Sequence, residues 1–232
     1  MGRRSARVDE GVFVVEGAAL VEQAVAAGWE LEGQYVSPDG VPVEGAGPTH
    51  HLWPGVIERV ASTEAPQPLL AVVRSRAVDL PPGADFVIVA DALGDPGNAG
   101  TIIRTAEGSG AQAVVLTPGS VDPFNPKVVR ASAGSLFRIP VVSCDLAAVR
   151  RAGLRLMATS SHRGTVYTDA DLTGPVAVVV GNEARGVPDD APVDEWLTIP
   201  QAGAESLNVA MAATVLAFEV ARQRRHGIES RR

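Results

Sequence analysis

The chain has 232 residues, of which 46% are hydrophobic and 20% charged, a balance that excludes a disordered protein and allows one large domain or two small ones. Its longest apolar runs, such as 176–180, are far shorter than the roughly 20 residues of a membrane-spanning helix. The single cysteine, Cys144, excludes an internal disulfide and a cysteine-based zinc site. The N-terminus lacks a long apolar segment, and the four histidines do not cluster with carboxylates at ligand spacing. We therefore expect a cytoplasmic protein that needs no metal and does not enter a membrane.

The formal net charge of −7 argues mildly against a nucleic-acid partner, but the distribution of charge is uneven. Residues 1–80 carry 6 Arg against 11 acidic residues, whereas residues 81–232 carry 14 Lys and Arg against 16 acidic residues. Basic residues of the second part gather at 127–138, at 150–155 and at the C-terminal end. Such local patches can hold RNA, although any one of them alone is explained by a solvated helix face.

The N-terminal part predicts a small α/β unit. Its periodicity indicates a strand, a helix, a strand, a short helix and a strand, at 11–17, 18–30, 31–37, 54–62 and 69–75. Arg3, Arg4 and Arg7 precede these elements, and we expect them to form a flexible basic terminus. A Pro-rich break at 77–85 then predicts the boundary between a domain 1–78 and a domain 84–228.

The second part alternates strands and helices. Apolar runs predict strands, and helical spacing predicts the segments between them; the strands are 86–90, 111–117, 141–144, 155–160, 175–181 and 196–200, and the helices 98–110, 125–140, 145–154 and 206–225. Continuous apolar strands that alternate with helices predict an α/β fold with a mostly parallel sheet and helices on both faces.

Three polar, glycine-containing loops follow strands of this sheet, at 94–100, 181–186 and 200–206. In open α/β sheets ligands bind beyond the carboxyl ends of the strands, so we expect the site there. Each loop alone has a simpler explanation. Asp95 or Asn98 caps a helix in the first, glycine supplies a positive φ in a strand-ending turn in the second, and Ser206 lies near a helix N-cap in the third. No GxGxxG follows a strand and no GxxxxGK[ST] occurs, which disfavours a Rossmann-type dinucleotide oxidoreductase.

Taken together, DPGNAGTIIRTAEGSGA (95–111), VVVGNEARGVP (178–188) and IPQAGAESLNVAMAATVLAFE (199–219) resemble the signature motifs of the SpoU/TrmH family of RNA ribose 2′-O-methyltransferases, in the SPOUT superfamily. RASAGSLFRIPV (130–141) stands where that family carries a further motif, and GVFVVEGAALVEQAVAAG (11–28) resembles its L30e-like substrate-recognition domain. The resemblance implies a C-terminal deep trefoil knot, S-adenosylmethionine as the cofactor, and a homodimer with composite sites. It also implies an RNA substrate, ribosomal (23S) RNA rather than transfer RNA.

The resemblance also implies roles for particular residues. Backbone and side-chain groups of the three loops would hold the cofactor, and the residues are Thr159, Gly181, Asn182, Glu183, Gly186, Ile199, Ser206, Leu207 and Asn208. Asn98, Arg104, Glu183, Ser206 and Asn208 match the family's polar catalytic positions, with Asn98 and Glu183 orienting Arg104 and the loops.

Arg104 lies in the family's catalytic position, yet arginine stays protonated at neutral pH and is a poor base. We expect Arg104 to remain charged and to bind an RNA phosphate or the incipient 2′-alkoxide. Two alternatives stay open for this residue: a transiently neutral base, and a structural salt bridge with Glu107 or Glu183. For the whole chain, a transfer-RNA methyltransferase and a catalytically silent RNA-binding module of the same fold are the other interpretations.

Overall fold

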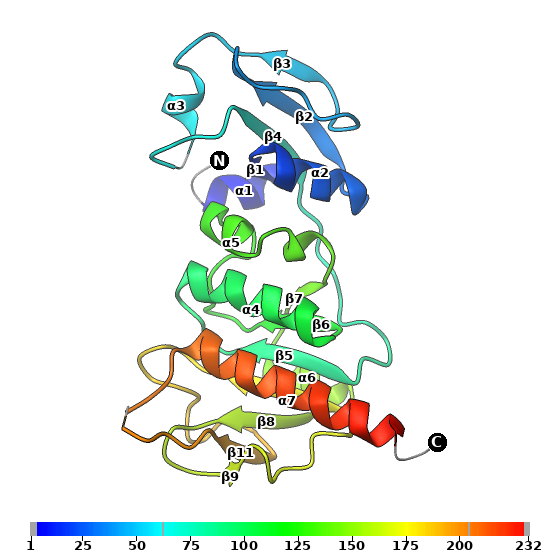
Figure 1. Cartoon of the computed structure of the whole chain (residues 1–232), viewed down its shortest axis with the longest axis vertical. Helices are drawn as coiled ribbons and strands as arrows, with labels where there is room; N and C mark the ends of the chain where they lie inside the picture. Colours follow the sequence, from blue (N-terminus) through cyan, green and yellow to red (C-terminus); the bar gives the residue numbers. More distant parts are fainter. Residues whose placement is uncertain (1–3, 62, 204, 230–232) are drawn as a thin grey trace.

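The computed structural model of the chain describes residues 4–61, 63–203 and 205–229, and Figure 1 shows two units, one above the other. The upper, N-terminal unit has a 4-stranded sheet in the order β1-β4-β2-β3, in which only β2 and β3 pair in parallel. Its elements are α1 (Arg4–Glu10), β1 (Val12–Glu16), α2 (Ala18–Ala26), β2 (Leu31–Val36), β3 (Thr49–His51), α3 (Ile57–Val60) and β4 (Leu69–Arg74).

The C-terminal unit has a 7-stranded sheet in the order β7-β6-β5-β10-β8-β11-β9, and every strand pair in it is parallel. Its strands are β5 (Phe86–Ala90), β6 (Ala113–Leu116), β7 (Val141–Ser143), β8 (Arg155–Thr159), β9 (Thr165–Val166), β10 (Val176–Val180) and β11 (Glu195–Thr198). Its helices are α4 (Pro96–Ser109), α5 (Pro126–Ala131), the 3₁₀ turn η1 (Ser135–Phe137), α6 (Leu146–Arg151) and α7 (Val209–Glu229).

The parallel sheet is buried on both faces, which explains why its strands are continuous apolar runs. Along β5, Phe86 and Ile88 face the core under α4, α5 and α7, whereas Val87 and Val89 face the core under α6. Figure 1 shows α4 and α7 side by side in front of the sheet and α6 behind it. The predicted α/β fold with a parallel sheet and helices is therefore confirmed.

Several predicted elements were wrong in detail. The helix expected over 125–140 ends at Ala131, because Ala133 and Gly134 have φ values of 49° and 88° and the chain resumes as η1. The final helix begins at Val209 instead of Ser206, and Asn208 caps it: its Oδ1 accepts from the backbone N–H groups of residues 210 and 211 at 2.9 and 3.3 Å. At α4 the capping residue is Asp95, not Asn98. The sequence did not predict α1, β3 or β9.

The N-terminal segment is not the flexible basic terminus that we expected, since Arg4 and Arg7 belong to α1. Arg7 is buried and forms an ion pair of 2.6 Å with Asp122 of the C-terminal unit. Arg3 lies outside the described residues.

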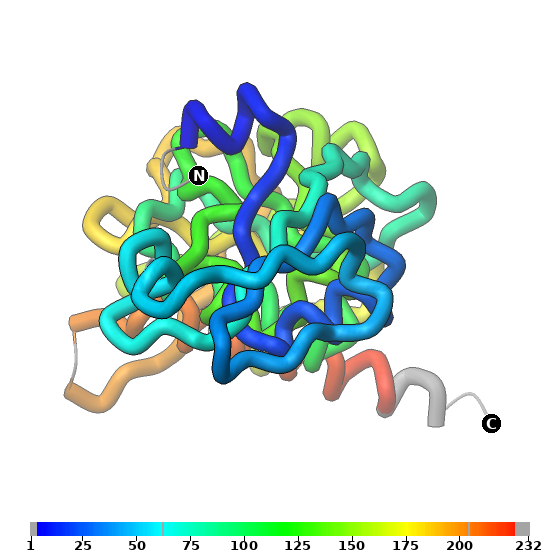
Figure 2. Tube along the Cα trace, turned by 90° about the horizontal axis from the view of Figure 1, so that it is seen from above, coloured from blue at the N-terminus to red at the C-terminus, as the bar shows by residue number. Residues whose placement is uncertain are grey.

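One hydrophobic core runs through both units. Trp29 of the N-terminal unit donates from Nε1 to the carbonyl of Phe137 at 2.9 Å and packs edge-on against Phe124 and Phe137 of the C-terminal unit. Burial of aromatic surface is a large stabilising contribution, so this contact fixes the N-terminal unit on the C-terminal unit instead of leaving it on a linker. Figure 2, seen from above, shows the N-terminal unit directly over the other.

Candidate active site

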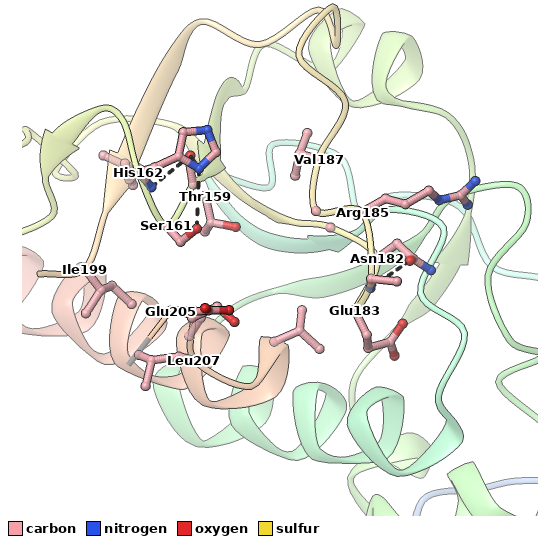
Figure 3. A pocket seen from close by; sticks show the side chains of 18 of the residues that line it. Thr159, Ser161, His162, Asn182, Glu183, Arg185, Val187, Ile199, Glu205 and Leu207 are labelled. Carbon is pink, nitrogen blue, oxygen red and sulfur yellow. Dashed lines mark hydrogen bonds between the residues drawn. The ribbon is translucent and has the colours of Figure 1, made fainter. Parts of the chain in front are cut away.

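A cavity of about 820 Å³ opens at the carboxyl ends of β8, β10 and β11, beside the start of α7 (Figure 3). This volume is in the range of roughly 300–1,000 Å³ found for cofactor and ligand sites. All of the predicted cofactor-binding residues line it: Thr159, Gly181, Asn182, Glu183, Gly186, Ile199, Ser206, Leu207 and Asn208. Segments that are far apart in the sequence therefore form one concave surface.

The loop after β10 is held in a tight turn by two glycines. Asn182 and Gly186 exchange backbone hydrogen bonds of 2.8 and 3.2 Å, and Gly186 has a φ of 67°. A Cβ on Gly181 would lie 2.1 Å from the backbone carbon of Gly186, so no other residue fits position 181. The side chain of Asn182 donates to the carbonyl of Ala92 at 2.9 Å, which ties this turn to the loop after β5.

Glu183 joins the same two loops. Its carboxylate accepts from the backbone N–H groups of Gly94 and Asp95 at 3.3 and 2.9 Å, and from Nδ2 of Asn98 at 3.2 Å. Burial opposes ionisation of this carboxyl, but its backbone hydrogen bonds and the Asn98 amide outweigh that effect and lower its pKa. Glu183 is thus a charged acceptor that holds the start of α4 against the β10 turn.

Asn208 completes this network from the third loop. Its Nδ2 donates to Oδ1 of Asn98 at 3.1 Å, while its own Oδ1 caps α7. Asn98 does not line the cavity, but through Glu183 and Asn208 it connects the two loops that do. Asn98 therefore connects the loops, but among the described residues no hydrogen bond or ion pair joins Asn98 or Glu183 to Arg104, which they were predicted to orient.

Arg104 does not lie where the other predicted residues gather. It is exposed on α4, does not line the cavity, and makes no hydrogen bond or ion pair with any residue that the structure describes. The alternative of a structural salt bridge is wrong, because Glu107 binds Arg138 and Glu183 binds the loops described above. Its guanidinium therefore lies apart from the network of Asn98, Glu183 and Asn208 in the part of the chain that the structure describes.

Sequence reasoning missed one wall of the cavity. Ser160, Ser161 and His162 follow Thr159 directly and line it (Figure 3). Arg163 follows them, with its guanidinium 3.8 Å from the ring centre of Trp196 and 2.5 Å from a carboxylate oxygen of Asp189. Their position directly after a buried strand could have indicated that they line the site. No glycine or helix-capping pattern marks this segment in the sequence, however.

The family comparison connects this site with known proteins. Residues 85–218 match the SpoU rRNA Methylase family, and residues 1–71 match the MRM3-like substrate binding domain. The chain belongs to the SpoU rRNA methylase family. Membership makes it an RNA methyltransferase, as the three motifs predicted.

Relatives of this SpoU methylase cover nearly its whole length. The 23S rRNA (guanosine(2553)-2′-O)-methyltransferase RlmP of Bacillus subtilis is 35% identical over 92% of this chain and 90% of its own. The 23S rRNA (uridine(2479)-2′-O)-methyltransferase of Streptomyces viridochromogenes is 33% identical, over 98% of this chain and 88% of its own. The crystal structure of the SpoU methyltransferase AviRb from that organism, in complex with AdoMet, superimposes on this fold with a TM-score of 0.87. The two sequences are 32% identical, and the match covers 96% of this chain and 94% of the AviRb chain.

The chemistry of the SpoU cavity fits S-adenosylmethionine, which carries a planar adenine whose faces suit apolar side chains, a ribose and a cationic sulfonium. Ile199, Leu207 and Val187 supply apolar walls, and Glu183 and Glu205 supply carboxylates that favour a cation. The described residues contain no group of three or more His, Cys, Asp or Glu side chains placed to hold a metal ion. No described helix is long and apolar enough to cross a bilayer.

Proposed function

We propose that this protein transfers the methyl group of S-adenosylmethionine to a ribose 2′-hydroxyl of 23S ribosomal RNA. The observation that carries the proposal is the cavity built from the three motif loops, in a chain whose relatives of similar length are 23S rRNA 2′-O-methyltransferases. The relatives act on different nucleotides, so the target nucleotide of this protein stays open.

The cofactor supplies an electrophilic methyl group, and the chain supplies binding and orientation. The cavity residues named above hold the cofactor, and the Asn98–Glu183–Asn208 network keeps the loops at a fixed separation. Arg104 binds an RNA phosphate or the developing 2′-alkoxide. A fixed cation stabilises that anion in the transition state and lowers the effective pKa of the hydroxyl.

The acting form is a homodimer with composite sites. Met211 and Phe218 lie on one face of α7, two turns apart, and are 63% and 46% exposed; Leu207, just before the helix, is 37% exposed. Gly108 faces Phe218, since an added Cβ would lie 3.7 Å from its Cζ, and Arg104 is one turn before Gly108 on α4. An apolar surface beside Arg104 suits a two-fold interface that brings Arg104 to the cavity of the partner.

Three finer features complete the proposal. The N-terminal unit, within residues 1–78, is an L30e-like domain that binds the RNA, and the methyltransferase domain is 84–228.

A deep trefoil knot forms where the loops after β10 and β11 lead back to α7; the position of β10 between β5 and β8 supports this threading. Because ribosomal RNA is the substrate, we place the enzyme in the cytoplasm.

The reaction is tested by transfer of labelled methyl groups from S-adenosylmethionine to unmodified transcripts of 23S rRNA and of transfer RNA. We expect label in 23S rRNA alone, at a linkage that resists alkaline cleavage. Label in transfer RNA alone would favour the transfer-RNA alternative. Absence of both label and cofactor binding would favour the silent module.

Composite sites are tested by mixing two inactive variants. Arg104→Ala lacks the cation, and Gly181→Ala displaces the β10 turn that shapes the cofactor cavity. If each site combines two subunits, a mixture reassociated in equal amounts regains about a quarter of the wild-type activity, because half of the dimers have one intact site. Sites contained within one subunit would give no such regain.

A further inference from the structure

The N-terminal unit carries exposed aromatic side chains that nothing in the active site uses. Trp53 is 83% exposed, the largest exposed fraction among the large hydrophobic side chains of the described residues. Exposure of an indole to water leaves its large apolar surface unburied, which folding alone does not favour. His50, three residues earlier, is also exposed.

Backbone hydrogen bonds fix Trp53 in place. The N–H of Leu52 donates to the carbonyl of Val36 at 2.8 Å, and the N–H of Val56 donates to the carbonyl of Trp53 at 3.2 Å. Pro54 and Gly55, whose φ is 80°, form the turn between these bonds. The indole therefore stands on a defined turn at the edge of the sheet, immediately before α3.

His50 and Tyr35 form a stacked pair beside this turn. Their rings are 5.0 Å apart between centroids, with an interplanar angle of 22°. The two residues are directly opposite each other on β3 and β2, so both rings lie on the same face of the sheet. A Cβ added at Gly33 would make ordinary contact with the imidazole of His50 at 3.6 Å, but it would lie only 3.0 Å from the carbonyl oxygen of Pro48, so Gly33 accommodates the close approach of the chain just before β3.

That face of the N-terminal sheet is only partly covered. Tyr35 pairs with Leu70, and Val72 on the same strand pairs with Val14, so these side chains share the face. Val14, Val72 and Tyr35 are half-buried, in contrast to the fully buried opposite face. The stacked pair therefore lies at the open margin of the sheet, and Trp53 lies within about 11 Å of His50 along the chain.

We propose that Tyr35, His50 and Trp53, which we call the aromatic edge, stack unpaired nucleobases of the ribosomal RNA substrate. This inference rests on the proposed function and adds the surface through which the N-terminal unit holds RNA. Aromatic rings on a sheet bind splayed bases because every base has a π-face, independent of sequence.

Two observations favour RNA as the occupant. Residues 1–71 match a family described as a substrate binding domain, and the aromatic edge belongs to them. In both Figures 1 and 2, α3, which follows Trp53 in the chain, lies toward the same side of the molecule as the loop between β11 and α7. Stacking also suits the acidic character of residues 1–80, because it needs no cationic side chain.

The test measures methyl transfer to an unmodified 23S rRNA transcript by Trp53→Ala, His50→Ala and the conservative Trp53→Phe. We expect Trp53→Ala to raise KM for RNA about tenfold, as base–aromatic stacking elsewhere does, with kcat and the Kd for S-adenosylmethionine unchanged. Trp53→Phe should recover most of the affinity. The rise in KM should persist when salt is increased, since stacking carries no net charge.

Fluorescence supplies an independent readout. RNA should quench the emission of the wild-type protein, and Trp53→Phe should reduce that quenching; the emission that remains comes from Trp29 and from Trp196, which lines the cavity. Val8→Ala, at a 69% exposed apolar position on α1, is the matched control and should behave as wild type.

An unchanged KM in both alanine variants would overturn the aromatic edge while leaving the methyltransferase function intact. Binding that depends on Trp53 but requires a ribosomal protein, and is not seen with protein-free RNA, would also overturn it. Failure of the wild-type protein to methylate any RNA would instead refute the proposed function.

Discussion

The two sheets of this molecule offer a ligand different surfaces. Both faces of the parallel C-terminal sheet are covered by helices. A ligand can therefore reach polar groups of this sheet only in the loops where the strands end, and the cavity lies there. The mixed N-terminal sheet packs one face on the shared core and leaves part of the other accessible, together with the aromatic side chains at its margin. A small ligand suits the first surface and an extended polymer suits the second.

The contrast extends to what holds each surface in place. At the cavity, backbone turns and the side chains of Asn98, Glu183 and Asn208 join loops of a single sheet. Between the units, a buried ion pair and the aromatic cluster around Trp29 fix the position of one unit on the other. Substitutions at different places should therefore change cofactor binding, turnover or the contact between the units one at a time.

The largest effect is expected at the cavity, from Gly181→Ala. The added Cβ would meet backbone at 2.1 Å and displace the β10 turn, so we expect no measurable cofactor binding and no methyl transfer. Calorimetry with S-adenosylmethionine measures the binding. Gly174→Ala is the control, because nothing lies within 4 Å of a Cβ at that position, and it should bind as wild type. Normal binding by Gly181→Ala would show that this turn does not shape the cofactor site.

Arg104→Ala separates binding from turnover. Because Arg104 does not line the cavity, the Kd for S-adenosylmethionine should be unchanged, whereas loss of a transition-state cation should lower kcat about 10²- to 10³-fold. Single-turnover methylation measures the chemical step. Arg59→Ala, another exposed arginine, should keep full activity. Intact methyl transfer by Arg104→Ala would remove Arg104 from the mechanism.

Asp122→Ala tests the connection between the units. It removes the carboxylate that forms the buried ion pair with Arg7, and we expect the free energy of unfolding to fall by about 3 kcal/mol. Urea denaturation measures the change. Glu32→Ala breaks an exposed ion pair with Arg74 and should cost less than about 1 kcal/mol. Equal losses in the two variants would mean that burial of the Arg7–Asp122 pair is irrelevant to stability.

The smallest effect is expected from the charge of Glu183. The pKa of Glu183 is lowered in the folded protein. Its contribution to the free energy of unfolding is therefore complete above its ordinary pKa of 4.5 and is lost as the pH falls through the lower, folded value. At neutral pH, Glu183→Gln should weaken cofactor binding only about threefold, as expected for a largely exposed charge. As the pH is lowered below 4.5, the free energy of unfolding should fall less in this variant than in the wild type; an identical acid response would assign that response to another group.

Local pattern predicted most of the C-terminal unit. The strand 86–90 was predicted with its observed bounds, because a continuous apolar run between polar loops is a local signal. The helix predicted over 98–110 starts slightly earlier, at Pro96, because Asp95 supplies the cap. Elements that depend on pairing, such as the three-residue β3 and the two-residue β9, were missed, since their own sequences carry almost no periodicity.

The sequence by itself determined the three loops, their residues and the family, because glycines, caps and apolar strands act over short distances and leave readable motifs. The tertiary structure decided which of those residues meet. It gathered the predicted cofactor residues on one cavity, placed Arg104 outside it, and paired Arg7 with Asp122 across 115 residues. Such contacts depend on strand order and on helix packing, which are properties of the whole chain and not of any segment.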